Sequence, residues 1–325
     1  MTPSDHDIGP CESACLIHVG AIGDFVLALR VVASLRTRWP EARIDVLGRP
    51  DIASLAVGRG GVDAATSMER LRLHSLFAET GPVDATCREY FAAFQVIVNM
   101  HSAAEATFAR RLGEASSARI VTIDPAPCDP TRHVTEGWMD DLRDAGISPS
   151  PDPPALTFSA AERLEGRRRL HHLTGVDDRP IVLLHPGSGG RTKCWSVKSF
   201  SDLAAWLHRA DVQPAFALGP VEIERHGTEM VDRLSRRAPT LVEPDLLRTA
   251  TVIAAADAYV GNDAGPTHLA AAAGTPTVAL FGPTDATVWR PLGDGVTVVE
   301  GRPAGRFDGV TVERVGAAVL TSLRR

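Results

Sequence analysis

The chain has 325 residues, about twice the ~150 residues typical of one domain, so its length predicts two domains. Hydrophobic residues make up 44% and charged residues 23%, a composition that excludes a largely disordered or fibrous protein. The net charge is −6, and the chain contains no basic block. Sequence-independent binding of nucleic acid needs Lys and Arg against phosphates, so we expect no nucleic-acid partner.

The first residues and the cysteines bear on location. The first ten residues contain neither the basic nor the apolar segment of a secretory signal, and no apolar run approaches the ~20 residues of a membrane span. The five cysteines are scattered and form no CxxC pair, so the sequence predicts neither a disulfide framework nor a zinc site. We expect a cytoplasmic protein without an integral membrane segment.

In the first half of the chain, apolar runs alternate with segments of helical period, which is typical of parallel α/β proteins. A helix is predicted from Asp24 to Arg38, before Pro40, and an amphipathic helix over 133–147. Buried strands are predicted at 15–19, 42–48, 94–100 and 119–124.

Residues 148–158 contain four prolines and predict a stiff linker between domains 1–150 and 151–325. The strand-and-helix pattern then resumes, with strands predicted at 181–187, 215–220, 258–263 and 277–283. Ligands of open α/β sheets bind beyond the carboxyl ends of strands. We therefore expect two Rossmann-like α/β domains with a ligand cleft between them.

The first candidate motif is GAIGD, Gly20–Asp24, between a predicted strand and helix. Glycines permit a tight turn and a close approach to a ligand, and the following helix N-terminus favours negative charge. Asp24 is either an N-cap of that helix or a carboxylate that takes a proton from a substrate hydroxyl. The motif lacks the GxGxxG pattern of a dinucleotide site.

The second motif is HPGSGGRTKCW, His185–Trp195, at the end of another predicted strand. Its backbone N–H groups and the Ser188 hydroxyl suit phosphate oxygens, although the Gly-Lys-[Ser/Thr] ending of a P-loop is missing. Only two of the 34 basic residues are lysines, and Lys193 lies in this loop. The combination favours phosphate binding over a chance surface lysine.

The third motif, Gly261–Pro276, places Asp263 and His268 around the start of a helix of small residues. Unpaired N–H groups of the first helical turn suit a sugar diphosphate. Taken separately, Asp263 reads equally well as a helix cap and His268 as a core histidine. The fourth motif, FGPTD at 281–285, is a Gly-Pro turn after a buried strand and carries little weight alone.

In their order along the chain, these motifs resemble the family 9 glycosyltransferases, the ADP-heptose heptosyltransferases of GT-B fold. The resemblance covers nearly the whole chain, and it also includes the segment 133–147 and the GPVE sequence at 219–222. It implies an inverting glycosyltransferase, with an N-terminal acceptor domain, a C-terminal donor domain and a C-terminal helix that can return to the N-terminal domain.

The resemblance also implies roles for single residues. Asp24 would be the catalytic base, with Gly23 and His101 as further candidates on the acceptor side. Glu222 would contact the ribose. The remaining donor-site residues would hold the phosphates, the adenine and the sugar: Gly187, Ser188, Lys193, Pro244, Asp263, Ala264, Gly265 and His268. No tightly bound cofactor or essential metal is expected, because a lysine and a helix dipole would stabilise the leaving diphosphate.

The sequence departs from the family pattern in three segments of the chain. Ala264 stands where a Ser or Thr usually follows the donor-site Asp, and Cys194 stands where Arg is common. Asn99 and His101 lie where the family commonly has an acidic residue. These changes leave the proposed base and phosphate ligands in place, and they bear on the acceptor and the donor sugar.

Two other functions compete with heptosyl transfer. One is a GT-B enzyme or epimerase that uses a UDP- or GDP-sugar, and the other is a nucleotide-sugar-binding protein without catalysis. A pure binding protein has no need of a base, so Asp24 together with Lys193 favours the transferase. The acceptor is either a sugar of the lipopolysaccharide inner core, which would bring peripheral membrane contact, or a soluble natural product. Sparse basic residues in the first half favour the soluble acceptor.

Overall fold

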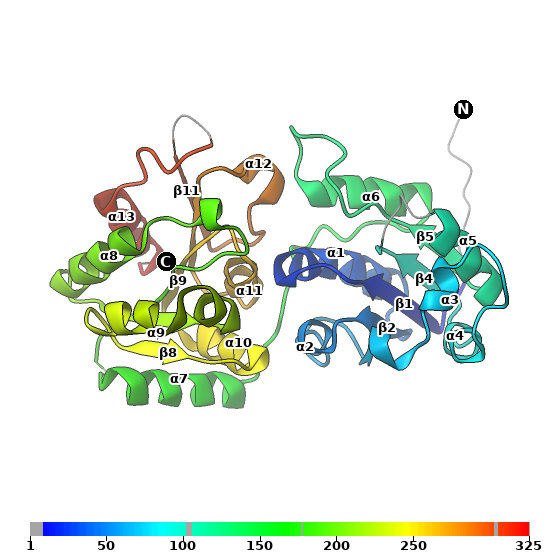
Figure 1. Cartoon of the computed structure of the whole chain (residues 1–325), viewed down its shortest axis with the longest axis horizontal. Coiled ribbons are helices and arrows are strands. Elements are labelled where there is room, and N and C mark those ends of the chain that lie inside the picture. Colours follow the sequence, from blue (N-terminus) through cyan, green and yellow to red (C-terminus); the bar gives the residue numbers. More distant parts are fainter. Residues whose placement is uncertain (1–8, 102–105, 177, 302–304, 325) are drawn as a thin grey trace. The chain divides into compact units, whose positions relative to one another are not determined.

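The computed structural model describes residues 9–101, 106–176, 178–301 and 305–324 (Figure 1). The chain divides into two compact units, Met1–Pro154 and Ala155–Arg325. The division falls within the proline-rich segment 148–158, which contains neither helix nor strand. No helix among the described residues combines the length and apolar character needed to cross a membrane.

The first unit contains a five-stranded parallel sheet in the order β3-β2-β1-β4-β5. Its strands are β1 (Ser13–His18), β2 (Arg43–Gly48), β3 (Ala64–Ser67), β4 (Val96–Asn99) and β5 (Arg119–Thr122). Its helices are α1 (Ile22–Arg38), α2 (Pro50–Ala53), α3 (His74–Phe77), α4 (Ala85–Phe91), α5 (Ala106–Ala115) and α6 (Val134–Asp144).

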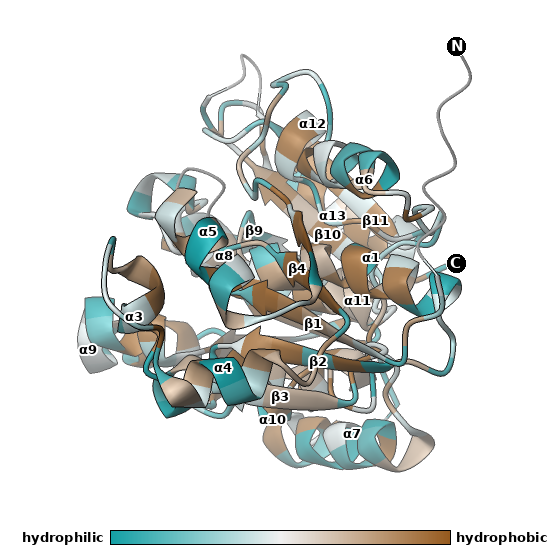
Figure 2. Ribbon diagram, turned by 90° about the vertical axis from the view of Figure 1, so that its right-hand side faces the viewer, coloured by the Kyte–Doolittle hydropathy of each residue, from teal (hydrophilic) through white to brown (hydrophobic). Residues whose placement is uncertain are grey.

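The central strands of this sheet are apolar because helices cover both of their faces. Figure 2 shows brown along β1 and β2, and teal on the outer surface of α4. Cys15, Ile17 and Ile97 are fully buried with Phe91 and Phe108 from the helices. Strand β1 is therefore held in the buried centre of the sheet, and the turn into α1 follows directly at its carboxyl end.

The second unit contains a six-stranded parallel sheet in the order β11-β10-β9-β6-β7-β8. Its strands are β6 (Ile181–His185), β7 (Gln213–Leu218), β8 (Thr240–Val242), β9 (Ala258–Asn262), β10 (Thr277–Phe281) and β11 (Val296–Glu300). Its helices are α7 (Ala160–Thr174), α8 (Val197–Arg209), α9 (Pro220–Ser235), α10 (Leu246–Ala255), α11 (Gly265–Ala272), α12 (Ala286–Trp289) and α13 (Val312–Ser322).

Local caps define the first helix of this unit, and packing against the core holds its last helix. Ser159 and Glu162 form a capping box at the start of α7, and Gly175 ends that helix in a left-handed conformation, with φ 67°. The C-terminal helix α13 packs on α8 and on β9, β10 and β11 of the same unit, with Val315 and Val319 fully buried.

The predicted α/β class with parallel sheets is confirmed, and the eight predicted strands match β1, β2, β4–β7, β9 and β10. The prediction that the first helix begins at Asp24 is wrong. Helix α1 begins two residues earlier, at Ile22, because the extended backbone of Ala21 serves as the N-cap. Asp24 therefore lies inside the first turn.

Candidate functional site

The turn from β1 to α1 holds Asp24 at the third position of the helix, with its carboxylate directed back to the chain entering the helix. Asp24 Oδ2 accepts a hydrogen bond of 3.2 Å from the N–H of Ala21. The interpretation of Asp24 as the N-cap is thus wrong, because Ala21 is the cap. A carboxylate in the first turn is stabilised by the positive end of the helix dipole. Asp24 is half-buried.

Gly20 separates Asp24 from a buried histidine at the end of β1. A Cβ atom on Gly20 would lie 2.9 Å from His18 Cε1 and 3.2 Å from Asp24 Oδ2, so the turn requires glycine here. Burial lowers the pKa of His18 to about 4, and its ring contacts Phe25 at 5.5 Å between centroids. His18 is therefore neutral at physiological pH and adds no positive charge beside Asp24.

The two acceptor-side candidates, Gly23 and His101, have different surroundings. Gly23 is the second residue of α1, next to Asp24. His101 follows β4, and its ring stacks on Phe108 with centroids 4.9 Å apart and a 5.2 Å contact to Phe77. The main-chain N–H of His101 donates to Asn99 Oδ1 at 3.0 Å. His101 is thus held in an aromatic cluster of the first unit, and its role toward an acceptor stays a prediction.

In the second unit, the loop after β6 is held by the side chain of Asn262 at the end of β9. Asn262 Nδ2 donates to the carbonyls of Pro186 and Gly187 at 2.9 and 3.2 Å, and its Oδ1 accepts from the N–H of Trp195 at 2.9 Å. Asn262 is fully buried. One side chain thereby joins the two ends of the predicted phosphate loop.

Asp263 brings together residues from three of the sequence motifs. Its Oδ2 accepts from Lys193 Nζ at 2.9 Å and from Thr284 Oγ1 at 2.8 Å, and its Oδ1 lies 3.9 Å from His268 Nε2. The Ser188 hydroxyl donates to its main-chain carbonyl at 2.7 Å. The expectation that Asp263 caps the next helix is wrong, because Ala264 is the N-cap of α11.

The carboxylate of Asp263 is charged over the whole ordinary pH range. Its burial acts to raise the pKa, but the nearby His268 ring and the hydrogen bonds from Lys193 and Thr284 outweigh burial and lower the pKa to about 2. The charge of Lys193 is correspondingly balanced by Asp263. Both predicted phosphate ligands, Ser188 and Lys193, therefore direct their donors at Asp263 in the structure.

Asp263→Asn is expected to lower the free energy of unfolding by about 2 kcal/mol at pH 7, because the folded carboxyl has a lower pKa than the ordinary ~3.9 of an unfolded Asp. A depressed pKa stabilises the fold above about pH 4, and this contribution is lost as the pH falls toward 2. Urea unfolding of both proteins at several pH values measures the difference. A difference that stays constant from neutral pH to pH 3 contradicts the prediction.

Glu222 lies in the first turn of α9 and faces the same loop. Its Oε2 accepts from the N–H of Gly219 at 2.9 Å, and its Oε1 lies 3.7 Å from His185 Nε2. A Cβ atom on Gly187 would lie 1.8 Å from Glu222 Oε1, so only glycine permits this approach. The carboxylate is thus buried against the loop, where the resemblance places the ribose.

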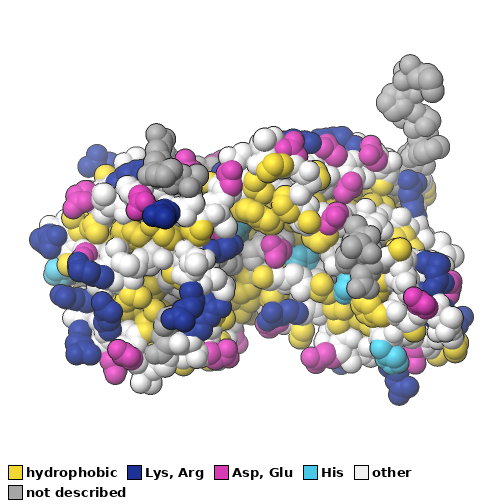
Figure 3. Space-filling view, turned by 45° about the horizontal axis from the view of Figure 1, so that its top comes forward, with side chains coloured by type: hydrophobic (Ala, Val, Ile, Leu, Met, Phe, Trp, Pro, Cys, Tyr) yellow, Lys and Arg dark blue, Asp and Glu magenta, His cyan; other side chains and the backbone are white. Residues whose placement is uncertain are grey.

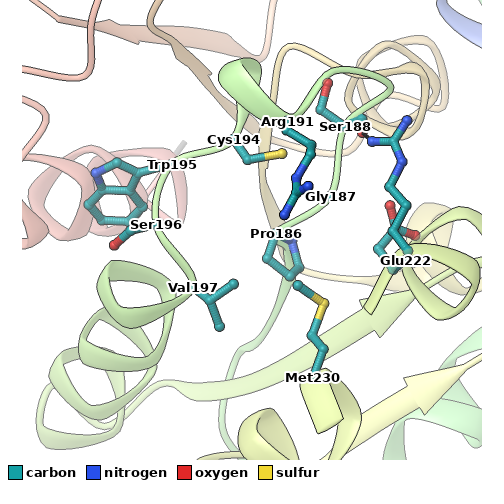
Figure 4. A pocket seen from close by; sticks show the side chains of 11 residues that line it. Pro186, Gly187, Ser188, Arg191, Cys194, Trp195, Ser196, Val197, Glu222 and Met230 are labelled. Atoms are coloured by element: carbon teal, nitrogen blue, oxygen red, sulfur yellow. Dashed lines mark hydrogen bonds between the residues drawn. The ribbon is translucent and has the colours of Figure 1, made fainter. Parts of the chain in front are cut away.

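A cavity of about 210 Å³ lies beside this loop (Figure 4). Three predicted residues line it, Gly187, Ser188 and Glu222. The other lining residues are Pro186, Arg191, Cys194, Trp195, Ser196, Val197, Arg225 and Met230. The cavity therefore lies between the loop and α9, and neither Lys193 nor Asp263 is among the residues that line it.

The remaining predicted donor residues also lie outside this cavity. Ala264, Gly265 and His268 form the start of α11, where no side chain caps the helix. Pro244 is exposed between β8 and α10. Ala264, Gly265 and His268 follow the carboxyl end of β9, and Pro244 follows that of β8.

Sequence reasoning missed Arg225, which anchors the middle of the loop. Its NH1 donates to the carbonyl of Ser188 at 2.7 Å, and its NH2 donates to that of Gly189. No local motif marks a helical arginine that reaches a loop 36 residues earlier. The three-residue spacing from Glu222, which places both side chains on one face of α9, was the available signal.

The chain is similar to known heptosyltransferases. The sequence profile of glycosyltransferase family 9 (heptosyltransferase) matches residues 146–306. Lipopolysaccharide heptosyltransferase 2 of Salmonella typhimurium is 25% identical over 312 residues, covering 86% of this chain and 85% of the relative. Lipopolysaccharide heptosyltransferase 3 of Escherichia coli is 23% identical over 301 residues, covering 83% of each chain.

Solved structures agree over the whole length. The structure of the E. coli ADP-heptose LPS heptosyltransferase II has a TM-score of 0.76 and 21% identity, covering 96% of this chain and 98% of that chain. The E. coli heptosyltransferase WaaC with ADP has a TM-score of 0.69 and 18% identity, covering 95% and 99%. These likenesses confirm the predicted GT-B class, with two Rossmann-like domains.

Proposed function

Since this chain belongs to glycosyltransferase family 9, we propose that it transfers a heptose from an ADP-activated donor to an acceptor hydroxyl, with inversion at the anomeric carbon. The observation that carries this proposal is the cluster around Asp263, where Lys193, Ser188 and His268 meet at the carboxyl ends of β6 and β9. Ligands of open α/β sheets bind at such ends.

In the donor half, Glu222 holds the ribose and the loop from Gly187 to Lys193 holds the diphosphate. Lys193 then shifts part of its interaction from Asp263 to the leaving phosphate, where charge develops in the transition state. Asp263 contacts the sugar hydroxyls, and Ala264, Gly265 and His268 lie along the sugar and the diphosphate. Pro244 contacts the adenine with its backbone. That no tightly bound metal or cofactor takes part stays a prediction.

In the first unit, Asp24 acts as the general base. Its carboxylate takes the proton of the acceptor hydroxyl while the hydroxyl oxygen forms a bond to the anomeric carbon. The bond between that carbon and the phosphate oxygen breaks, and ADP leaves with the electron pair. The ring of His18 behind Gly20 is neutral, so it does not form an ion pair with the carboxylate of Asp24.

The first unit also bears on the kind of acceptor. On the face that Figure 3 shows, its Lys and Arg side chains are scattered among acidic ones and form no single patch. A strongly phosphorylated acceptor is bound by clustered guanidinium groups. We therefore favour a small acceptor with few phosphates over a phosphorylated lipopolysaccharide core.

ADP is expected to raise the melting temperature more than UDP or GDP at equal concentration. A ligand that binds only the folded protein stabilises it by RT ln(1 + [L]/Kd), so the best-fitting base gives the largest shift. Thermal unfolding with the three nucleotides and with ADP-heptose measures this. A larger shift with UDP or GDP would reject the ADP donor and support another nucleotide sugar.

Catalysis is tested separately from binding by following ADP release from ADP-heptose with and without candidate acceptors. ADP-heptose that binds tightly and is never consumed, by water or by any acceptor, would indicate a nucleotide-sugar-binding protein.

A further inference from the structure

The two arginines that line the cavity beside the loop after β6 are engaged differently. Arg225 directs both terminal nitrogens at main-chain carbonyls of the loop, those of Ser188 and Gly189. The main-chain carbonyl of Arg191 accepts from the N–H of Cys194, but its guanidinium group makes no hydrogen bond and no ion pair with any residue that the structure describes. Figure 4 shows its side chain extending from the loop toward Pro186, beside Cys194. One arginine thus supports the loop, and the other is available to a ligand.

The charges around the loop also indicate that Arg191, and not Arg225 or Lys193, is available to a ligand. The ammonium group of Lys193 is paired with Asp263 at 2.9 Å, and the low pKa of Asp263 keeps that pair ionised. The cavity lining contains two guanidinium groups and one carboxylate, that of Glu222, which leaves one positive charge in excess. Because Arg225 is committed to the loop carbonyls, Arg191 carries the uncommitted donors.

We propose that Arg191 binds the diphosphate of the donor nucleotide, as a ligand additional to Lys193. This inference rests on the proposed function, because it takes the nucleoside diphosphate as the ligand of this site. A guanidinium group offers a planar fork of donors that matches two phosphate oxygens, whereas an ammonium group is a point charge. Arg191 and Glu222 line the same cavity, so one nucleotide can reach both with its phosphates and its ribose.

The two arginines are also expected to differ in what their loss does to the fold. Removing the Arg191 guanidinium breaks no bond among the described residues, so the melting temperature of the unliganded protein stays unchanged. Removing that of Arg225 leaves the Ser188 and Gly189 carbonyls without their donors, so the melting temperature falls. Comparing variants of Arg191 and Arg225 therefore separates a role in ligand binding from a role in holding the loop.

The test is titration calorimetry of ADP and of adenosine with the wild-type protein, Arg191→Gln and Arg191→Lys. Arg191→Gln is expected to raise the Kd of ADP about tenfold or more, the scale of a hydrogen bond to a charged group, and to leave the Kd of adenosine unchanged. Arg191→Lys restores only part of the loss because it lacks the fork. Arg209→Gln, the same change at an exposed position in the last turn of α8, is the matched control.

Two results would overturn the proposal for Arg191 and leave the proposed function in place. The first is that Arg191→Gln binds ADP as tightly as the Arg209→Gln control does. The second is that Arg191→Gln weakens the binding of ADP and of adenosine equally, which would place Arg191 against the nucleoside. If the wild type binds UDP or GDP in preference to ADP and Arg191→Gln weakens that binding, the ADP donor is wrong and the role of Arg191 stands. If the wild type binds no nucleoside diphosphate, both proposals fail.

Discussion

Asp24→Asn is expected to slow sugar transfer by about 10²–10⁴-fold, the usual contribution of a positioned general base. Asparagine has the same shape, and its side-chain oxygen can still accept the hydrogen bond from the N–H of Ala21, so the turn before α1 keeps its structure. It cannot take a proton from the acceptor hydroxyl. Single-turnover release of ADP from saturating ADP-heptose, in the presence of acceptor, measures the rate.

ADP binding and thermal stability are the controls for this variant, and both are expected to stay at the wild-type values. Asp51→Asn provides a matched change, because Asp51 also lies in the first turn of a helix in the first unit. Transfer within a few-fold of the wild-type rate would leave Asp24 a structural residue and make His101 the next candidate for the base. A collapse of ADP binding would instead assign the turn to the donor site.

Lys193→Ala is expected to lower kcat/KM by about 10- to 100-fold, the range of a hydrogen bond between charged groups. The loss should appear in both donor binding and turnover, because the ammonium group contacts the diphosphate before reaction and more strongly as it leaves. Lys193→Arg should not fully restore activity, since a guanidinium group presents its donors differently. Steady-state kinetics together with ADP calorimetry separate the two effects.

The chain supplies its own control for this change. Lys198, the other lysine, is exposed on α8 and paired with Asp202, so Lys198→Ala should leave kinetics unchanged. Wild-type kinetics in Lys193→Ala would show that its pair with Asp263 is a structural contact only. A fall in kcat with an unchanged KM would indicate that Lys193 acts only as ADP leaves.

The fold was predictable where strands are buried on both faces. Strands such as β1, β6 and β10 are continuous apolar runs between turn residues, so their sequences suffice to identify them. The three strands missed, β3, β8 and β11, lie at sheet edges and are partly exposed. At an edge, pairing depends on the neighbouring strand more than on the hydrophobicity of the run.

The candidate site was predictable where a strand ends in a Gly-rich turn, as at Asp24, Ser188 and Asp263. Contacts between distant segments were not predictable. The pair of Lys193 and Asp263 joins residues 70 positions apart, and a local pattern contains no information on which cation a given carboxylate meets. Arg191 and Arg225 were also missed. Almost every basic residue of this chain is arginine, so the presence of an arginine at one position does not distinguish it from the others.

The hydrogen bonds of Asn262 bear on the thermodynamics of ligand binding. Its side chain ties residues 186, 187 and 195 together through hydrogen bonds within the protein. The entropy lost by ordering that loop is therefore part of the cost of folding, and a nucleotide that arrives later does not have to supply it. More of the intrinsic interaction energy of the diphosphate remains available, both for affinity and for stabilising the charge that forms on ADP as it leaves.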